Sequence, residues 1–371
     1  MNKKTERIIM LILLAVLVIP LSAPSVSACT GIVLEGQDGT TVYGRTMEWS
    51  QFDLHSQLVV YPRETEFQGT TPEGKNGISW TAEYGFLAIE LMGRASDDGM
   101  NEVGLAGGAF YHTGFAEYSE YDPSLADQSL APTDVLPYIL SNFSSISEVK
   151  EGMKEVEVIS VVDPTLNKAV PFHLMIAEPD GDSLVIEFTN GEIKFFDNPV
   201  GVITNNPTFD WHLQNLRNYG KLSVEPYEEK TWGEQEITPL ASGSGLLGLP
   251  GDFTSPSRFV RAALLKEVAM KTTGGMETVN EFFRIMDSFN VPNSQGEGTK
   301  GEEDSERMPS DTQWTVGHDM DNLVTYYHTM YNRRVRKVEL SEIDFGKSGV
   351  RKVALDEEKE QNVKDVTGKL D

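Results

Sequence analysis

Residues 29–50 read CTGIVLEGQDGTTVYGRTMEWS, and the prediction of the fold starts from this stretch. Two strand-like runs, TGIVLEG and TTVYGRTMEW, flank Asp38-Gly39, a residue pair typical of tight hairpin turns. The stretch therefore predicts that the chain opens as antiparallel sheet. It begins with Cys29, the only cysteine of the 371 residues. The role of a single thiol at the start of a core strand has to be explained.

The 28 residues before Cys29 have the composition of a secretory signal. Lys3, Lys4 and Arg7 form a positive region, residues 8–21 are apolar, and residues 26–28 read VSA, the small residues that a signal peptidase requires. The apolar run of about 14 residues is shorter than the ~20 needed to cross a bilayer as a helix. We therefore predict a signal peptide over residues 1–28, cleavage before Cys29, an extracytoplasmic protein and no membrane-spanning segment.

The length and the charge limit the kind of protein this chain can be. One cysteine cannot form an intramolecular disulfide, so stability has to come from a hydrophobic core, which a chain of this length can bury. We see no linker in the middle of the chain and expect one domain over residues 29–345, followed by a charged tail, 346–371. The net charge is −26 and becomes −28 without the signal, whose four charged residues sum to +2. Such a surface repels nucleic acid, because phosphate binding depends on Lys and Arg.

The rest of the sequence alternates between strand and helix patterns. Further strands are expected at 78–91, 103–112, 171–197, 312–319 and 322–345. Apolar residues at every third or fourth position predict two short helices within 132–156 and further helices at 207–220, 255–270 and 276–289. Residues 293–311 are acidic and poor in apolar side chains, which predicts a solvated loop. This order favours two sheets packed face to face with helices outside, although an ordinary α+β fold has the same elements.

Three explanations of Cys29 are open at this point: a lipid attachment site, a buried filler and a nucleophile that cleavage creates. The sequence Val26-Ser27-Ala28-Cys29 resembles a lipobox, which would make the protein a lipid-anchored, ligand-binding lipoprotein and not an enzyme. A core strand directly after the cysteine argues against the polar tether of anchored proteins. If cleavage frees residue 29, its amine, with a pKa of about 7.7–8, can accept the proton of its own thiol, whose pKa is about 8.5.

Four further stretches accompany the opening one: MNEVGLAGGAFYH (100–112), GVITNNPTFDWHLQNLRNYG (201–220), GLPGDFTSPSRFVRAA (248–263) and TQWTVGHDMDNLVTYYHTMYNRRVRKVEL (312–340). In this order they span nearly the whole chain after residue 28, and together they resemble the choloylglycine hydrolase or penicillin V acylase family of linear amide C–N hydrolases. Members of this family are N-terminal-nucleophile hydrolases, in which a terminal cysteine attacks an amide. The resemblance implies a four-layer αββα sandwich of two antiparallel sheets flanked by helices.

The resemblance also implies roles for two residues near the nucleophile. Arg45, in GRTMEW, matches the family arginine whose positive charge favours the thiolate and lowers the thiol pKa. The alternative is a surface arginine on a strand. Glu48 stands where many members have aspartate, and its carboxylate could accept hydrogen bonds from the α-amine. Its extra methylene can displace this contact, and a purely structural glutamate is the alternative.

Three more positions carry over from the family. Asn205, the first asparagine of TNNPTF, matches the catalytic asparagine, whose amide would stabilise the oxyanion by roughly 2.7–4 kcal/mol. Asn206 is the other candidate, and NNP is also ordinary turn chemistry. Tyr111 aligns with a position that is tyrosine in several penicillin-V-cleaving members, where the backbone N–H is the second oxyanion donor; a core aromatic residue is the alternative. Arg258 matches the second family arginine, and Arg261, one turn later, is expected on the surface.

The implied reaction is hydrolysis of a linear amide without a metal or organic cofactor, because protein groups supply proton transfer and oxyanion stabilisation. The histidines do not have the spacing of a His-Glu-x-x-His site, and the papain-like CGSCW pattern is absent around Cys29. Penicillin V, conjugated bile salts and N-acyl homoserine lactones are candidate substrates, each with an apolar acyl group. The export signal and Tyr111 favour a penicillin V acylase. Homotetramers are common in the family, so this assembly is a further expectation.

Overall fold

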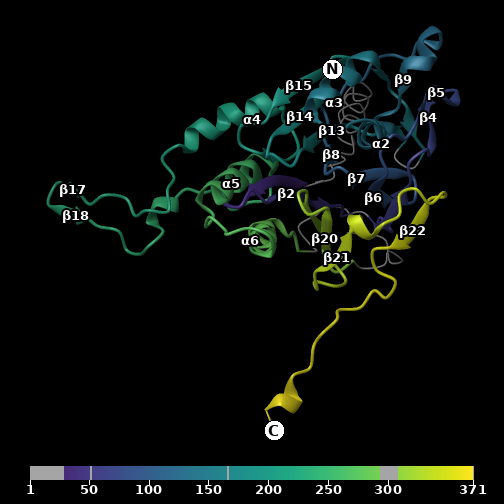
Figure 1. Cartoon of the computed structure of the whole chain (residues 1–371). Helices are drawn as coiled ribbons and strands as arrows, with labels where there is room; N and C mark the ends of the chain where they lie inside the picture. Colours follow the sequence, from purple (N-terminus) through teal and green to yellow (C-terminus); the bar gives the residue numbers. More distant parts are fainter. Residues whose placement is uncertain (1–28, 51, 165–166, 293–307, 371) are drawn as a thin grey trace, which may run out of the picture.

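The structure, a computed structural model, describes residues 29–50, 52–164, 167–292 and 308–370 (Figure 1). The predicted export signal and most of the predicted acidic loop lie outside these residues. In the described part of the chain, two large antiparallel sheets form the framework. One has six strands in the order β16-β1-β2-β19-β20-β21, and the other has eight in the order β15-β14-β13-β8-β7-β6-β3-β22.

The strands of the six-stranded sheet are β1 (Thr30–Glu35), β2 (Thr41–Glu48), β16 (Val202–Ile203), β19 (Thr312–Asp319), β20 (Val324–Thr329) and β21 (Arg336–Glu339). Those of the eight-stranded sheet are β3 (Gln57–Tyr61), β6 (Phe86–Leu91), β7 (Ala95–Asn101), β8 (Ala106–Tyr111), β13 (Phe172–Ala177), β14 (Ser183–Thr189), β15 (Glu192–Asp197) and β22 (Arg351–Ala354). Smaller two-stranded pairs are β4 (Glu66–Thr71) with β5 (Gly74–Thr81), β9 (Ser129–Leu130) with β10 (Glu157–Val158), β11 (Val162–Asp163) with β12 (Lys168–Ala169), and β17 (Lys230–Trp232) with β18 (Gln235–Ile237). Within the described residues, the α-helices are α2 (Val135–Asn142), α3 (Ile146–Gly152), α4 (Phe209–Leu216), α5 (Ser255–Val268) and α6 (Met276–Met286).

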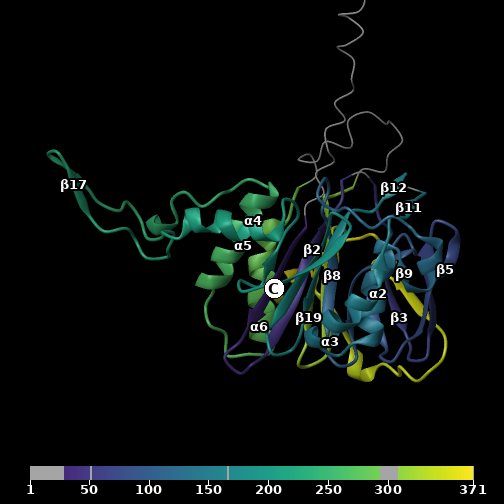
Figure 2. The same ribbon diagram turned by 90° about the horizontal axis from the view of Figure 1, so that it is seen from above.

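The two sheets pack face to face, and helices cover their outer faces (Figure 2). Helices α5 and α6 contact β1 and β2 of the smaller sheet, whereas α2 contacts β7 and β8 of the larger one. The predicted αββα sandwich is confirmed. Among the described helices, none combines the length and the apolar character needed to cross a membrane.

Strand β13 illustrates why the larger sheet is buried on both faces. Its alternate residues Leu174 and Ile176 join the apolar cluster under α2, whereas Met175 and Ala177 join the cluster between the sheets. Successive side chains of a strand point to opposite faces. A continuous apolar run therefore predicts a strand covered on both sides, as the sequence FHLMIA is here.

The interface between the sheets also contains polar side chains. The hydroxyl of Tyr43 on β2 lies 3.5 Å from Asp98 Oδ2 on β7, and His318 Nε2 lies 2.6 Å from Asp98 Oδ1. Arg45 crosses the same interface next to Gly108 on β8. A Cβ atom at Gly108 would lie 2.7 Å from the Tyr43 hydroxyl and 3.0 Å from Arg45 Cδ. Position 108 therefore has to be glycine, because any side chain there would collide with the buried Tyr43 and Arg45.

The segment predicted as a charged tail contributes to the larger sheet. Strand β22 pairs with β3, with Arg351 opposite Val60 and Ala354 opposite Gln57. Beyond Leu355, which is buried, Asp356 still pairs with Arg336 and Lys359 with Asp53. The last residues of the chain then extend away from the body of the protein (Figure 1). The region 346–371 is thus partly sheet edge, because an edge strand can be charged on its open side and still complete a backbone ladder.

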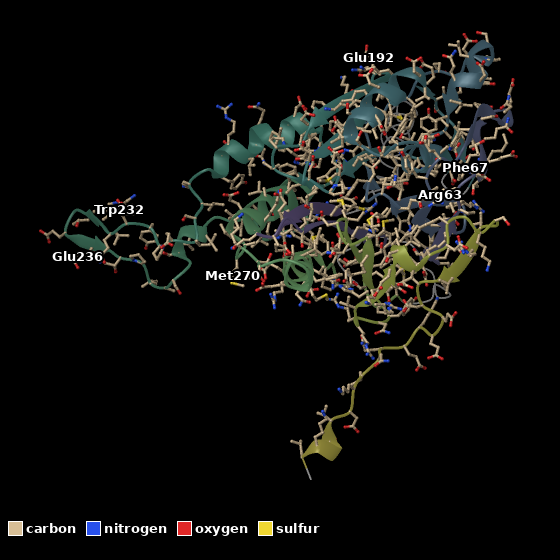
Figure 3. All side chains as sticks on the ribbon, in the orientation of Figure 1. Arg63, Phe67, Glu192, Trp232, Glu236 and Met270 are labelled. Atoms are coloured by element: carbon tan, nitrogen blue, oxygen red, sulfur yellow. The ribbon has the colours of Figure 1, made fainter. Side chains whose placement is uncertain are left out.

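A hairpin arm between α4 and α5 was not predicted from the sequence. In the part of the chain that the structure describes, β17 and β18 pair only with each other. They lie far from the sandwich, with Trp232 and Glu236 near the end of the arm (Figure 3). Trp232 is 70% exposed and Leu240 is 99% exposed. The segment expected as one strand at 322–345 is also divided, into β20 and β21, by a turn in which Thr329 N–H donates to Asn332 O.

Candidate active site

Cys29 lies directly before β1, buried between the two sheets with 1% of its surface exposed. Its backbone N–H donates to Asn205 Oδ1 at 2.7 Å, and its carbonyl accepts from Arg258 Nη1 at 2.5 Å. Its Sγ lies 3.0 Å from Arg45 Nη2 and 3.8 Å from Met47 Sδ. The structure therefore brings three of the predicted site residues onto the three polar groups of Cys29.

Arg45 reaches Cys29 because β2 pairs with β1, with Arg45 opposite Gly31. Its guanidinium is fully buried and also donates to the Asp97 carboxylate at 2.8 Å and to the Ala109 carbonyl. Burial disfavours the charged guanidinium, but Asp97, Cys29 and Asp98 together outweigh it, and the pKa of Arg45 lies above its ordinary value. The alternative of a surface arginine is wrong, and a permanent positive charge lies beside the thiol.

The thiol pKa differs from the expectation. Burial raises the pKa of Cys29, and the positive charge of Arg45 lowers it by less than burial raises it. The carboxylates of Glu48 and Asp97 raise it further. Desolvation disfavours any charged form, so one adjacent arginine does not produce a resting thiolate here. A neutral thiol needs a base before it can attack a substrate.

Glu48, at the end of β2, does not make the expected contact. Its Oε1 accepts a hydrogen bond from the Thr312 hydroxyl at 3.0 Å, whereas the nitrogen of Cys29 is held by Asn205. Thr312 is the partner of Glu48 across the β2–β19 ladder, so the side chain bonds to its neighbour strand. Burial raises the pKa of Glu48 to about 7, against the opposing influence of the Arg258 charge.

The raised pKa of Glu48 makes folding stability depend on pH. Its folded-state pKa of about 7 lies above its ordinary value of 4.5. Glu48 therefore contributes stability that is fully present below pH 4.5 and is lost as the pH rises through 7. As the pH rises from 4.5 to 8, the free energy of unfolding of the wild type should fall by up to about 3 kcal/mol relative to that of the Glu48→Gln variant, because glutamine does not titrate. Urea unfolding at both pH values measures the difference, and parallel curves for the two proteins would contradict the burial of a titrating carboxyl here.

Asn205 follows β16, and both the oxygen and the nitrogen of its side-chain amide form hydrogen bonds. Oδ1 accepts from Cys29 N and from Arg258 Nη2, each at 2.7 Å, and Nδ2 donates to the Tyr111 carbonyl at 2.8 Å. Asn206 is exposed. Of the two asparagines, Asn205 is therefore the one that the structure brings to Cys29. It also gives Asn205 a role that the sequence reasoning missed, because its oxygen holds the nitrogen of Cys29.

The two arginines of α5 are both buried. Arg258 Nη1 donates to the Cys29 carbonyl and, at 2.8 Å, to the Thr30 hydroxyl, and its Nε donates to the Phe253 carbonyl. Arg261 was expected on the surface, and this expectation is wrong, since only 7% of it is exposed. It donates to the carbonyls of Pro250 and Asp252, so it holds the loop before α5 and does not contact Cys29.

An apolar cavity of about 60 Å³ opens beside Cys29. Its wall contains the Tyr111 side chain, whose pKa burial raises, and the residues Trp49, Phe52 and Leu54 from the segment after β2. The remaining wall comes from both sheets and from the β11–β12 hairpin: Met47, Leu91, Met92, Ala95, Ala109, Val170 and Phe172, with Arg94, Asp97, Thr133 and Asp163 as polar members. The cavity suits the apolar part of a substrate whose reacting group lies at the thiol.

Gln313 shapes this cavity and was missed in the sequence. From β19, its Nε2 donates to the carbonyls of Trp49 and Phe52, and its Oε1 accepts from Leu54 N–H at 2.9 Å. One buried side chain thus holds the backbone of three cavity-lining residues. The stretch TQWTV was expected to be only a core strand, and nothing in its pattern indicates a partner more than 250 residues earlier in the chain.

Three buried groups, His112, His173 and Glu187, have ligand atoms close enough for a metal ion. The two imidazole rings are stacked, with centroids 4.2 Å apart and an interplanar angle of 8°. A ring nitrogen binds a metal through a lone pair in the ring plane. One ion cannot lie in the planes of two stacked, nearly parallel rings, so the arrangement does not fit a metal site.

Residues 29–358 match the family described as linear amide C-N hydrolases, choloylglycine hydrolase family. The "Bile salt hydrolase/transferase" of Clostridium perfringens is 34% identical over 322 residues, which cover 84% of this chain and 92% of that protein. The "Penicillin V acylase" of Pectobacterium atrosepticum is 24% identical over 339 residues, which cover 85% of this chain and 81% of that protein.

Solved structures are similar as well. A variant of the conjugated bile acid hydrolase from Clostridium perfringens superposes with a TM-score of 0.78 and 28% identity, covering 91% of this chain and all of that one. The penicillin V acylase from Agrobacterium tumefaciens gives a TM-score of 0.70 at 23% identity, covering 88% of this chain and 92% of that one. At this identity the second likeness concerns the fold alone.

Proposed function

Because the chain belongs to the linear amide C–N hydrolases of the choloylglycine hydrolase family, we propose that it hydrolyses a small-molecule amide with Cys29 as an N-terminal nucleophile. The observation that supports this most strongly is that three buried polar side chains contact the nitrogen, the carbonyl and the sulfur of Cys29. Any buried residue needs partners for its backbone N–H and carbonyl. A structural cysteine needs no charged partner for its sulfur, since a buried thiol behaves as a small apolar group, so the contact with Arg45 is the distinctive one.

The proposal requires that residues 1–28 are removed during export. While Cys29 is joined to residue 28, its nitrogen is an amide and cannot accept a proton. Once it is free, the α-amine lies on Asn205 Oδ1 and has a pKa of about 7.7–8, which suits a base at neutral pH. Mass spectrometry of the secreted protein tests this: an unmodified terminal Cys29 is expected, and a diacylglyceryl adduct would favour the lipoprotein alternative.

The reaction then proceeds by acyl transfer to sulfur. The α-amine takes the thiol proton, and Sγ forms a bond to the amide carbon, whose oxygen becomes an oxyanion. The C–N bond breaks as the amine passes the proton to the leaving nitrogen, which leaves a thioester. Water attacks this thioester and gives a proton to the same amine. The C–S bond breaks, the acid leaves, and the proton returns to the sulfur.

Two donors suit the oxyanion. The Asn205 Nδ2 group carries two hydrogens, of which one is directed to the Tyr111 carbonyl. At the end of the β8–β13 ladder, His112 N–H donates to Pro171 O and so points toward β13. In an antiparallel pair, successive residues direct their backbone N–H and C=O groups alternately toward and away from the partner strand. The N–H of the preceding residue, Tyr111, therefore points away from β13. The N–H and carbonyl of Tyr111 then point to the same side, where Asn205 lies. Each such donor typically contributes roughly 2.7–4 kcal/mol to the transition state.

For the acyl group, we infer a compact aromatic amide of the penicillin V type. The cavity of about 60 Å³ is bounded by Trp49, Phe52, Tyr111 and Phe172, and aromatic walls favour a flat ring. A benzene-sized guest occupies a cavity on the order of 150 Å³. The cavity is smaller than this, so even a phenoxyacetyl group would require some movement of its wall. A four-ring steroid would require a much larger movement of Trp49, Phe52 and Leu54.

Conjugated bile salts are the second candidate, because the relative with 34% identity is described as a bile salt hydrolase/transferase. Hydrolysis of penicillin V, glycocholate, taurocholate and a long-chain N-acyl homoserine lactone, measured as kcat/KM, distinguishes the candidates. We expect penicillin V to give the highest value. A higher value for either bile salt would reverse the order, and no hydrolysis of any member would contradict the proposed function.

We also propose a homotetramer in which the β17–β18 arm binds a second copy of the chain. A hairpin that pairs only with itself is marginally stable in water, and Trp232 and Leu240 expose large apolar surfaces on it. We expect the Trp232→Glu variant to shift the mass measured by light scattering towards smaller species. Glu236→Gln, on the opposite strand of the hairpin, serves as the control with unchanged mass. A wild-type protein that is monomeric at micromolar concentration would contradict this assembly.

A further inference from the structure

We propose that His173 and His212 are positioning residues for Asn205. Each donates a hydrogen bond from its ring to one of two consecutive backbone carbonyls, those of Thr204 and Asn205. The proposal rests on the proposed function, since it concerns how Asn205 is kept in contact with Cys29. Neither histidine lines the cavity beside the thiol, so neither is a candidate for substrate binding.

The contacts come from two different elements. His173 on β13 places its Nε2 at 3.0 Å from the Thr204 carbonyl, and His212 on α4 places its Nε2 at 3.1 Å from the Asn205 carbonyl. Both rings are 1% exposed. From the other side, the hydroxyl of Ser255 at the start of α5 accepts the Asn205 N–H at 2.9 Å. The peptide groups on both sides of the Asn205 Cα are thus held by side chains.

Both rings are neutral donors. A carbonyl oxygen can only accept a hydrogen bond, so the hydrogen lies on each Nε2, and within the described residues neither Nδ1 has a hydrogen-bond partner. Burial lowers the pKa of His173 to about 3 and that of His212 to about 4. Each ring therefore keeps the same tautomer across the neutral range, and His212 is fixed further by stacking on Phe259 at 4.6 Å between centroids.

The far end of the same segment is held by Glu187. Its Oε1 accepts the Phe209 N–H at the first turn of α4, at 2.6 Å, and lies 3.6 Å from His173 Nδ1. Burial raises the pKa of Glu187, which favours the protonated acid beside the neutral ring. Residues 204–209 are therefore anchored from β13, β14 and α5 as well as from α4, which is more than a surface turn requires.

This anchoring matters because the Asn205 side chain meets three partners at once. Its Oδ1 lies between Cys29 N and Arg258 Nη2, and its Nδ2 contacts the Tyr111 carbonyl. A short side chain with two rotatable bonds can meet all three only from one backbone position. If a carbonyl anchor is lost, the peptide can rotate, and the amide would then leave the nucleophile nitrogen.

The test compares variants at position 212. In His212→Leu, which removes the donor, we expect kcat to fall about 10- to 100-fold with KM changed less than about threefold, because reacting groups are displaced while the cavity is intact. In His212→Gln, whose amide nitrogen can occupy the place of Nε2, we expect kcat within about threefold of the wild type. The matched control is His328→Leu: His328 is also a buried histidine, with 4% exposed, and it packs on Phe283 away from the site. This control should lower the melting temperature and leave kcat unchanged.

The outcomes separate a positioning role from a purely structural one. Equal kcat values for the Leu and Gln variants, or for the Leu variant and the wild type, would overturn the proposal. If His212→Leu does not fold, His212→Asn replaces it, since its shorter amide cannot reach the carbonyl, and kcat for Gln should exceed that for Asn. If the wild type cleaves no amide, the proposed function fails. Hydrogen exchange at residues 202–209 then decides the inference alone: faster exchange in the variant without the donor supports it, and equal exchange in all variants overturns it.

Discussion

Replacing Cys29 with alanine will reduce amide hydrolysis by at least about 10⁴-fold, because the substitution removes the atom that bonds to the acyl carbon. The residual rate would come from the remaining groups that bind and polarise the substrate. KM, where it can be measured, should change little, since the cavity wall consists mainly of other side chains. The measurement is kcat/KM for the best substrate of the panel, with the mature N-terminus confirmed by mass spectrometry.

Cys29→Ser provides the matched variant. It keeps the size of the side chain, the α-amine and the contact with Asn205, but a hydroxyl is a much weaker nucleophile than a thiol near neutral pH. We expect its rate to lie between those of alanine and cysteine, at least about 100-fold below the wild type. Urea midpoints of all three proteins should agree closely. Full activity in the alanine variant, with correct processing, would rule out Cys29 as the nucleophile.

Much of the sandwich could be predicted because its elements are encoded locally. The β1–β2 hairpin follows from two apolar runs around Asp38-Gly39, and Gly39 adopts a φ of 90°, which only glycine adopts readily. Helices α5 and α6 follow from their apolar periodicity and from Pro256 in the first turn of α5. These features depend on residues within one turn or one hairpin of each other.

The parts that could not be predicted depend on residues far apart in the sequence. Arg261 has the surroundings of a surface helical arginine, and only the loop carbonyls that fold over it make it buried. Glu48 bonds to Thr312, whose register is set by a ladder with a strand at the other end of the chain. The buried His173 on β13 contacts Thr204, and the buried His212 on α4 contacts Asn205. No periodic pattern in the sequence marks such contacts.

The substrate, in contrast to the fold, could not be predicted from the sequence, and the preference for a penicillin V acylase is an example. It was based on Tyr111 and the export signal, and the relatives compared above do not support it over a bile salt hydrolase, because the higher identity is to the latter. A substrate is selected by the shape of loops such as the Trp49–Leu54 segment. That shape depends on distant supports such as Gln313, so family motifs in the catalytic centre carry little information about it.

The Asn205→Ala variant should show the second-largest loss of activity, with kcat reduced about 10²- to 10³-fold. The substitution removes the acceptor that holds the Cys29 nitrogen and one of the two proposed oxyanion donors. It also leaves Arg258 Nη2 without its 2.7 Å partner inside the protein, so some loss of stability is expected as well. Asn205→Asp separates the two effects, because its carboxylate can still accept from the amine but cannot donate to an oxyanion.

Asn206→Ala is the matched control, because Asn206 is the adjacent asparagine of the same turn and its side chain is exposed. Its kcat and KM should equal those of the wild type within about twofold, as for most surface substitutions away from a site. If Asn206→Ala were instead the inactive variant and Asn205→Ala the active one, the oxyanion would have to be stabilised from the solvent side of the turn. The contacts of Asn205 with Cys29, Arg258 and Tyr111 would then be structural, and the base and the oxyanion donors of the reaction would have to be reassigned.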